Sequence, residues 1–466
     1  GFWLCPFPDP RYSSAFTQSN RQETTIMAGI FKAYDIRGIY GDTLTDDMAF
    51  QIGRAIFAFL GCRKVVIGRD MRPHSKPLFD ALARGLTLQG ANVIDLGLCS
   101  TPMSYYANKL LGADASIMIT ASHNPGPWNG FKICRANATP LSGATGILDI
   151  ERIVREEDFA PPAPARGQIS TYDILPDYVE HFRAFADLRR PLNVLVDYAN
   201  AMGILEAKVF DGLFSITPLF DTLDGTFPNH EANPLDTHTL ADAQQAVRAG
   251  QYDFAACFDG DADRVGFIDE KGDIIPMDMI TALIARTLLK KNPGANIFYD
   301  LRSSWAVREV IEEAGGIPNR SRVGHAFIKA QMREKDALFA GELSGHYYFK
   351  ENSFAESSAL AVLLIANLVS QSDQPLSSLI APIQRYVASG EINSTVADAP
   401  AVLDKLRVRY ADADILELDG LSFEYPTWWF NVRCSNTEPL VRLNLEAKTR
   451  AEMEQRRDEV LALIRA

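Results

Sequence analysis

The 466-residue sequence predicts an α/β fold with three similar mixed α/β-sheet domains plus a C-terminal α+β domain. Two observations lead to this prediction. A strand–helix–strand order recurs three times along the chain, and after about residue 389 the pattern changes to strand-like runs between two helices. A chain of this length also exceeds what one hydrophobic core usually organises, which favours several domains.

The three repeats begin with apolar runs typical of buried strands, at residues 65–67, 194–196 and 297–299. Helical stretches follow them at about residues 76–88, from Met202 and from Ser304, and second strands are expected near Val93, Ile216 and Arg320. This order predicts parallel βαβ units, because parallel neighbouring strands need a crossover connection. In the last domain we expect helices at 402–410 and from Ala451, with strands at 415–418, 430–432 and 441–445 between them.

Proline positions and composition set the expected domain borders. Residues 1–26 combine three prolines with a polar stretch and lack a signal-peptide pattern, so we expect a disordered N-terminal extension and a native start at Met27. Prolines at 161, 162 and 164 favour an extended linker, because proline cannot donate a ladder hydrogen bond. The expected domains are residues 27–165, 166–272, 273–388 and 389–466.

The charge balance excludes several classes of partner. The chain has 46 basic and 59 acidic residues, a formal net charge of −13, and no long run of Lys and Arg. Such a chain is not expected to bind nucleic acid or an anionic membrane surface. Its six cysteines show no Cys-x-x-Cys spacing, and no apolar run reaches the roughly 20 residues of a membrane span. We expect a cytoplasmic protein that is a monomer or a small homo-oligomer.

A candidate nucleophile, Ser122, lies in the segment TASHNP at residues 120–125, after a predicted strand at 115–119. Ligands of α/β sheets bind beside the carboxyl ends of strands, and Ser122 falls at such an end. The Asn-Pro-Gly-Pro run that follows favours a fixed turn that can present the hydroxyl. An ordinary turn is the alternative interpretation of this segment taken alone.

A second loop carries three alternating aspartates, Asp259, Asp261 and Asp263, after a predicted strand at residues 254–258. Three carboxylates repel one another unless a cation neutralises them, and an all-oxygen ligand set suits Mg²⁺ or Ca²⁺. An EF-hand is the alternative, with Glu270 at its twelfth position. Arg264, however, stands where that loop needs glycine, and the flanking segments are strand-like rather than helical.

Two further loops carry clusters of polar side chains. The segment GELSGH, residues 341–346, presents Glu342, Ser344 and His346 between glycines, a set suited to recognising sugar hydroxyls. The segment RCSNTEP, residues 433–439, offers several donors for phosphate oxygens. Both are also compatible with simple turns, where Gly, Ser and Asn are common.

Together and in this order, the four loops resemble the α-D-phosphohexomutase family, over nearly the whole chain from Phe31 onward. The segments FKAYDIRG at 31–38 and GRD at 68–70 are similar to that family as well. The TASHNP and GELSGH versions resemble its bacterial phosphomannomutase branch, which includes dual-specificity phosphomannomutase/phosphoglucomutases. Phosphoglucosamine mutases usually lack the hydroxyl before Ala121, so the likeness to them is weaker.

The resemblance implies a heart-shaped enzyme whose four domains surround a central cleft. It also implies transfer of a phosphoryl group between positions 1 and 6 of a hexose phosphate, with Ser122 as the phosphoserine. One Mg²⁺ per chain would be held by the seryl phosphate of Ser122 and by Asp259, Asp261 and Asp263. A hexose 1,6-bisphosphate is implied as the intermediate and activator.

Further roles are implied residue by residue. Catalytic positions of the family are matched by Arg37, Lys132, Arg264, His325 and His346, with Lys132 and His346 as candidates for proton transfer. Substrate-binding positions are matched by Tyr34, Arg302, Glu342, Ser344, Arg433, Ser435, Asn436 and Thr437. Two positions depart from the family. Ala262 replaces a common glycine and is expected to need a negative φ, and Arg302 stands where dual-specificity relatives have lysine.

The resulting expectation is reversible interconversion of mannose 6-phosphate and mannose 1-phosphate. Phosphoglucomutase activity or dual specificity is the alternative. A metal-dependent sugar phosphatase and a non-catalytic sugar-phosphate sensor are remote alternatives, because fold alone does not fix function. The phosphatase would release inorganic phosphate, and the sensor would not need the complete set of catalytic residues.

Overall fold

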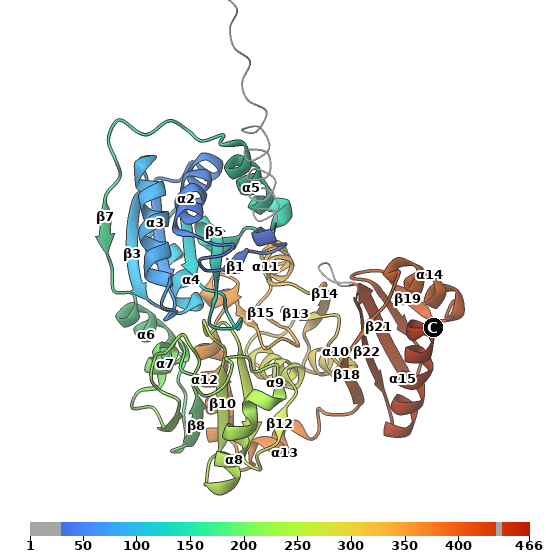
Figure 1. Ribbon diagram of the computed structural model, residues 1–466. Coiled ribbons are helices and arrows are strands. Elements are labelled where there is room, and N and C mark those ends of the chain that lie inside the picture. Colours follow the sequence, from blue (N-terminus) through green and yellow to red (C-terminus); the bar gives the residue numbers. More distant parts are fainter. Residues whose placement is uncertain (1–28, 435–439) are drawn as a thin grey trace, which may run out of the picture. The chain divides into compact units, whose positions relative to one another are not determined.

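The computed structural model describes residues 29–434 and 440–466, so the expected extension at 1–26 lies outside the described residues. The chain forms two compact units. One takes in the described part of Gly1–Leu175 together with Leu223–Pro228, and the other comprises Pro176–Thr222 and Asn229–Ala466. Four sheets follow one another along the chain (Figure 1). The predicted α/β architecture of three mixed sheets and a strand-rich C-terminal domain is confirmed.

The first unit contains a seven-stranded sheet with the order β1-β5-β4-β2-β3-β7, and β6 pairs with β5. Its strands are β1 (Ile36–Ile39), β2 (Lys64–Arg69), β3 (Asn92–Leu98), β4 (Ala115–Ile119), β5 (Trp128–Arg135), β6 (Thr139–Pro140) and β7 (Ile169–Thr171). β2 pairs in parallel with β3 and β4, whereas β5 pairs antiparallel with β1 and β4. Its helices are α2 (Asp46–Leu60), α3 (Ser75–Leu88), α4 (Thr101–Leu110) and α5 (Ile147–Glu156).

Helices α2 and α3 approach each other closely at two glycines. A Cβ atom on Gly53 would lie 2.4 Å from the Leu82 carbonyl oxygen, and one on Gly85 would lie 2.2 Å from the Phe50 carbonyl oxygen. Such distances leave no room for a side chain, so both positions require glycine. The close helix pair packs its buried aliphatic residues into the core of the first unit.

The second unit begins with two mixed five-stranded sheets. Their orders are β12-β11-β10-β8-β9 and β14-β13-β15-β16-β17. The strands are β8 (Asn193–Asp197), β9 (Ser215–Leu219), β10 (Phe254–Phe258), β11 (Val265–Asp269), β12 (Ile274–Ile275), β13 (Asn296–Asp300), β14 (Ile317–Ser321), β15 (Phe339–Gly341), β16 (Tyr347–Phe349) and β17 (Ala355–Glu356). The helices are α6 (Leu175–Arg183), α7 (Gly203–Glu206), α8 (Ala241–Ala249), α9 (Met277–Leu289), α10 (Trp305–Glu313), α11 (His325–Glu334), α12 (Ser358–Ser370) and α13 (Leu376–Ile380).

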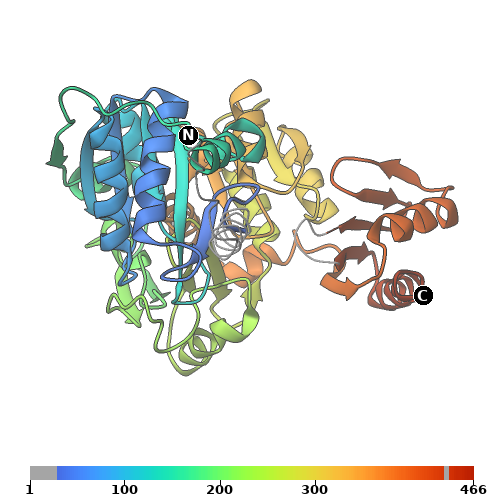
Figure 2. The ribbon, with the colours of Figure 1, turned by 45° about the horizontal axis from the view of Figure 1, so that its top comes forward.

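The C-terminal domain of this unit has an antiparallel sheet with the order β18-β22-β21-β20-β19. Its strands are β18 (Val387–Thr395), β19 (Asp414–Leu416), β20 (Leu421–Glu424), β21 (Trp428–Cys434) and β22 (Leu440–Ala447). Helices α14 (Ala399–Arg409) and α15 (Arg450–Arg465) lie along one face of it (Figure 2). Buried aromatic residues of β20 and β21 fill the space beneath them.

Two details add to the sequence expectations. The helix expected from Met202 is present as α7, and a 3₁₀ turn at Ala207–Phe210 follows it after Glu206. In the first unit, β7 pairs with β3, so this unit continues past residue 165 to Leu175. The expected border at 165 and the other three borders stay predictions.

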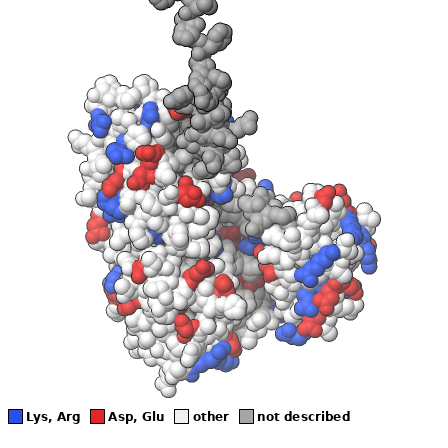
Figure 3. All heavy atoms as spheres, in the orientation of Figure 1, with Lys and Arg blue, Asp and Glu red and all other residues white. Residues whose placement is uncertain are grey.

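The surface and the helices give two further observations. On the face drawn in Figure 3, acidic and basic side chains are interspersed. Within the described ranges, no helix combines the length and apolar content that crossing a bilayer requires.

A buried ion pair in the second unit yields a prediction about stability. Lys329 and Glu356 lie 2.5 Å apart, and their side chains are 0% and 1% exposed. Replacing Lys329 with Met should lower the free energy of unfolding by about 3–5 kcal/mol, because it removes the cation that pairs with the buried Glu356 carboxylate. Chemical denaturation followed by circular dichroism measures the change. The double variant Lys329→Met/Glu356→Leu should recover much of the loss.

The matched control is an exposed lysine that pairs with an exposed aspartate. Lys350 and Asp336 also lie 2.5 Å apart, but their side chains are 42% and 69% exposed. Replacing Lys350 with Met should cost less than about 1 kcal/mol, because water screens the pair. Equal losses for the two lysine variants would contradict the prediction.

Candidate active site

Ser122 follows the carboxyl end of β4 and lies in the loop that leads to β5. Its φ angle is 51°, in the left-handed region, and its N–H donates a hydrogen bond of 2.9 Å to Oγ1 of Thr120. The Ser122 Oγ atom lies 3.3 Å from Nδ1 of His123, and the whole residue is 1% exposed. A non-glycine residue with this φ costs free energy, so the surrounding contacts must hold the hydroxyl in its direction.

Two of the predicted cations lie in the same unit as Ser122. Arg37, on β1, donates from Nη1 to Oδ1 of Asn124 at 2.5 Å and also pairs with Asp35. Lys132, on β5, is opposite Met118 of β4 and is 9% exposed. Arg37 therefore directly contacts the loop that carries Ser122, residues 120–127, which we call the serine loop. The remaining predicted residue of this unit, Tyr34, is half-buried in the bend before β1.

In the second unit, the three predicted aspartates converge in the loop between β10 and β11. Asp259 and Asp261 are 0% exposed and Asp263 is 3% exposed. One carboxylate oxygen of each lies within 4.8 Å of the others. Three buried carboxylates this close would repel one another strongly, so the donor set and its burial fit a hard divalent cation.

The loop at residues 259–264, which we call the metal loop after its predicted role, corrects one sequence expectation. Ala262 was expected to need a negative φ, but its φ is 58°. Its carbonyl accepts a hydrogen bond of 2.5 Å from Oγ of Ser358, at the start of α12, and its N–H donates to the Asp259 carbonyl at 3.2 Å. These contacts hold an alanine in a conformation that glycine adopts more readily.

His346 connects the metal loop to the predicted sugar-binding loop. Its Nε2 atom lies 3.3 Å from Oδ1 of Asp263 and 3.1 Å from Nε of Arg264. On the other side of the ring, Nδ1 lies 3.2 Å from Oε2 of Glu342 and 2.8 Å from Oγ of Ser344. The structure thus brings five predicted site residues, from two different sheets, into one contact network.

Buried charge shifts the pKa values of His346 and Glu342 in opposite directions. Burial and Arg264 lower the pKa of His346, but Asp263 and Glu342 outweigh them and raise it to about 9. Burial raises the pKa of Glu342, but His346 and Arg302 outweigh it and hold that pKa well below its usual range. Each group therefore stabilises the charged form of the other.

Arg302 and His325 also lie near this network. Arg302 pairs with Asp300, a fully buried residue at the end of β13, through a contact of 2.8 Å. The same Asp300 carboxylate accepts from the Leu343 N–H at 2.7 Å, which ties Arg302 to the sugar-binding loop. His325 begins α11, and the N–H of the preceding Gly324 donates to Oε1 of Glu342 at 3.0 Å.

Glu391 was not among the predicted site residues, although it holds two of them. Its carboxylate lies 2.8 Å from Arg433 of β21, 3.8 Å from Arg302 and 3.6 Å from Arg442. It therefore connects the C-terminal sheet to the preceding sheet. In the sequence, the segment GEINS at residues 390–394 resembles bacterial phosphomannomutases, but this likeness gave no indication of the partners of Glu391. The predicted Ser435, Asn436 and Thr437 lie outside the described residues.

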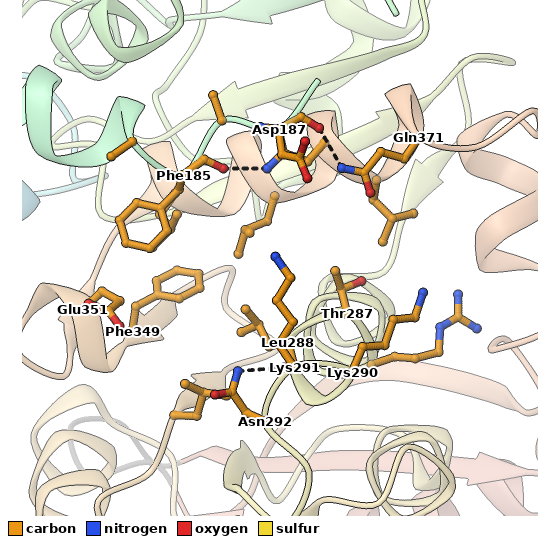
Figure 4. A pocket seen from close by; sticks show the side chains of 18 of the residues that line it. Phe185, Asp187, Thr287, Leu288, Lys290, Lys291, Asn292, Phe349, Glu351 and Gln371 are labelled. Carbon is orange, nitrogen blue, oxygen red and sulfur yellow. Dashed lines mark hydrogen bonds between the residues drawn. The ribbon is translucent and has the colours of Figure 1, made fainter. Parts of the chain in front are cut away.

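A cavity of about 880 Å³ in the second unit lies apart from these loops. Side chains of Lys290 and Lys291, just beyond the end of α9, lie on one side of it, and Phe185 and Gln371 lie on the other (Figure 4). Among the described residues that line it, none belongs to the predicted site. This cavity is therefore separate from the predicted site residues.

Comparisons with known proteins relate the chain to one family. Residues 28–161, 176–272 and 276–386 match alpha/beta/alpha domains I, II and III described as phosphoglucomutase/phosphomannomutase, and residues 391–463 match the C-terminal domain of the same description. The chain is 41% identical to an Escherichia coli protein named phosphomannomutase, across 93% of this chain and 99% of that one. It is 40% identical to a Xanthomonas campestris protein named phosphohexose mutases, across 93% and 99%.

A solved structure also resembles the chain. A phosphoglucomutase/phosphomannomutase family protein from Burkholderia thailandensis superposes with a TM-score of 0.86 at 33% identity, over 93% of this chain and 96% of that one. A Thermus thermophilus protein, at 21% identity and a TM-score of 0.78 over 92% and 98%, shares the fold.

The left-handed Ala262 yields a prediction. Replacing Ala262 with Gly should raise the free energy of unfolding by up to about 1 kcal/mol, because glycine adopts this φ without a steric penalty. Chemical denaturation in the absence of divalent cations measures the change. Ala138, at φ 53° in the first unit, allows a matched Ala138→Gly comparison that should shift stability in the same direction. A clear loss of stability for Ala262→Gly would contradict the interpretation.

Proposed function

Because the chain belongs to the phosphoglucomutase/phosphomannomutase family, we propose that it is a phosphomannomutase that interconverts mannose 6-phosphate and mannose 1-phosphate. The observation that supports this most is the buried Ser122, held in a left-handed turn at a strand end, in the same chain as a loop of three converging aspartates. Curated relatives that the chain matches over nearly their full length also carry the name phosphomannomutase.

In the proposed reaction, Ser122 carries the phosphoryl group between the two positions of the sugar. The seryl Oγ–P bond breaks as a hydroxyl oxygen of the hexose monophosphate forms a bond to the same phosphorus. The hydroxyl proton passes to a base, and an acid supplies a proton to the released seryl Oγ. The product of this step is a hexose 1,6-bisphosphate. The bisphosphate then returns its other phosphoryl group to Oγ, so phosphate is neither gained nor lost overall. Lys132 and His346 are the proposed proton-transfer groups.

We assign metal binding to Asp259, Asp261 and Asp263, together with the seryl phosphate of Ser122, and propose Mg²⁺ as the ion. The donors are all oxygens, which suits Mg²⁺ better than softer metals. When bound, the ion supplies a positive charge that stabilises the phosphoryl oxygens. Arg264, adjacent in sequence, is proposed to add a guanidinium charge to the same oxygens.

Substrate recognition is assigned to residues on the other loops. Glu342 and Ser344 are proposed to bind sugar hydroxyls, and Arg433, with Ser435, Asn436 and Thr437, to bind the phosphate that does not react. Tyr34, Arg37, Arg302 and His325 complete the proposed set. A site that recognises the phosphate group itself can bind the phosphate at position 1 or at position 6. This suits a bisphosphate intermediate that must react from either end.

Glucose phosphates are the second candidate substrates. Arg302 bears on the choice between mannose and glucose phosphates, because a planar guanidinium places its donors differently from the lysine of dual-specificity relatives. The hexose 1,6-bisphosphate is proposed as the activator, since it converts dephosphorylated enzyme to the phosphoserine form. We propose a cytoplasmic enzyme that acts as a monomer or a small homo-oligomer.

Replacing Ser122 with Ala should lower turnover by several powers of ten, because the phosphoryl carrier is lost. A coupled assay with mannose 1-phosphate or glucose 1-phosphate, Mg²⁺ and a trace of hexose 1,6-bisphosphate measures it. Ser116→Ala, a buried serine on β4, controls for loss of a hydroxyl in the same part of the sheet. Retained turnover in the Ser122 variant would overturn the assignment, and release of inorganic phosphate by the unmodified protein would indicate a phosphatase.

Replacing Asp261 with Asn should weaken Mg²⁺ or Mn²⁺ binding by about tenfold or more. Replacing residues that only hydrogen-bond to metal ligands already lowers metal affinity by about that factor, and loss of a ligand should cost at least as much. Isothermal titration calorimetry of the protein without substrate measures the affinity. Asp269→Asn, at the far end of β11, is the matched control and should bind the metal normally. Equal affinity for the two variants would remove Asp261 from the ligand set.

A further inference from the structure

Arg72 binds four backbone carbonyls of the serine loop and one at the start of β5. Its side chain is 0% exposed and pairs through Nε with Oδ2 of Asp70 at 3.1 Å. Its Nη atoms donate to the carbonyl oxygens of Ser122 (2.9 Å), Asn124 (2.6 Å), Pro125 (2.8 Å), Gly126 (3.3 Å) and Trp128 (3.0 Å). One guanidinium therefore contacts four carbonyls of a loop that lacks regular secondary structure and a fifth at the first residue of β5.

Asp70 holds this guanidinium in place. Its carboxylate also accepts hydrogen bonds from the Arg72 N–H at 3.1 Å and from Oγ of Ser75 at 2.5 Å. Both residues of the pair are fully buried, so the pair cannot exchange with water without opening the loop. The Ser122 carbonyl thus accepts a hydrogen bond from a guanidinium that this buried pair holds in place.

A short segment from elsewhere in the chain covers Arg72. Residues Leu223–Pro228 pack in the first unit, although Thr222 and Asn229 on either side belong to the second. The ring of Phe227 lies 5.0 Å from Cζ of Arg72. We call Leu223–Pro228 the strap.

The strap is shaped to approach the arginine closely. A Cβ atom on Gly225 would lie 2.5 Å from Cα of Arg72, and one on Gly126 of the serine loop would lie 3.2 Å from the Gly225 carbonyl oxygen. Phe227 has a φ of 54°, which is rare for a bulky residue, and its N–H donates to the Asp224 carbonyl at 3.1 Å. Strained backbone of this kind persists only where the packing around it determines it.

We infer that Arg72 is a positioning residue that sets the conformation of the serine loop, and that the strap fixes Arg72 through the ring of Phe227. The inference rests on the proposed role of Ser122 as the phosphoryl carrier. Phosphoryl transfer depends on alignment of the reacting atoms, so a small displacement of the loop lowers turnover more than it lowers substrate binding.

The test compares two aromatic rings that each cover an arginine of the first unit. Phe227 covers Arg72, whereas Phe159 lies 4.1 Å from Cζ of Arg54, which does not bind the serine loop. The variants are Phe227→Leu, Phe227→Tyr and Phe159→Leu, each in the full chain. The readouts are kcat, KM and the unfolding midpoint. A further readout is the rate at which hexose 1,6-bisphosphate phosphorylates Ser122, followed by mass spectrometry of the intact protein.

We expect Phe227→Leu to lower kcat and the Ser122 phosphorylation rate by about tenfold, with KM changed less than about twofold. Phe227→Tyr keeps the ring and should restore most of the rate. Phe159→Leu should change the unfolding midpoint to a similar extent and leave kcat within about twofold. Arg72→Lys, which keeps the charge but has three donors, should reduce both rates further if it folds.

Two results would overturn the inference: normal kcat and phosphorylation in Phe227→Leu, or an equal loss in Phe159→Leu. A Ser122→Ala variant, measured in the same assays, distinguishes failure of the inference about Arg72 from failure of the proposed function. If Ser122→Ala is inactive while Phe227→Leu is normal, only the inference fails. If Ser122→Ala keeps its turnover, the proposed carrier role fails with it.

Discussion

The pairing of buried charge is the constraint on which the site of the second unit depends. Removing an ionised group from water costs several kcal/mol unless an opposite charge or a hydrogen bond compensates. Asp263, Glu342 and Asp300 are all nearly inaccessible to water, and each lies against a cation: His346 contacts the first two, and Arg302 contacts the third. Because Asp300 also binds the backbone of the sugar-binding loop, these pairs fix the position of that loop relative to the metal loop.

Strained backbone is the second feature common to the functional loops. Ser122 and Ala262 both have positive φ, and both lie just beyond the carboxyl end of a buried strand. In each case a partner from another part of the chain holds the turn. Arg72 binds the Ser122 carbonyl, and Ser358 binds the Ala262 carbonyl. A loop fixed in this way needs little rearrangement to present its side chains, which favours a reaction that depends on alignment.

The sequence predicted the features that depend on local patterns. Apolar runs and helical periodicity predicted the repeated βαβ order, and alternating carboxylates predicted the convergence at Asp259 to Asp263. The sequence could not predict the φ of Ala262, because that angle depends on a contact with Ser358, almost a hundred residues later. Glu391 was missed for a similar reason, since its role depends on arginines from three strands or strand ends that only tertiary structure brings together.

The charge balance around Glu391 is the counterpart of the balance in the metal loop. Arg302, Arg433 and Arg442 surround its carboxylate, and Asp300 also pairs with Arg302. Arg302 also stabilises the charged form of the buried Glu342, so carboxylates surround these arginines on several sides. Glu391 reduces the repulsion between the arginines enough for them to converge. The aspartates of the metal loop need a cation for the same physical reason.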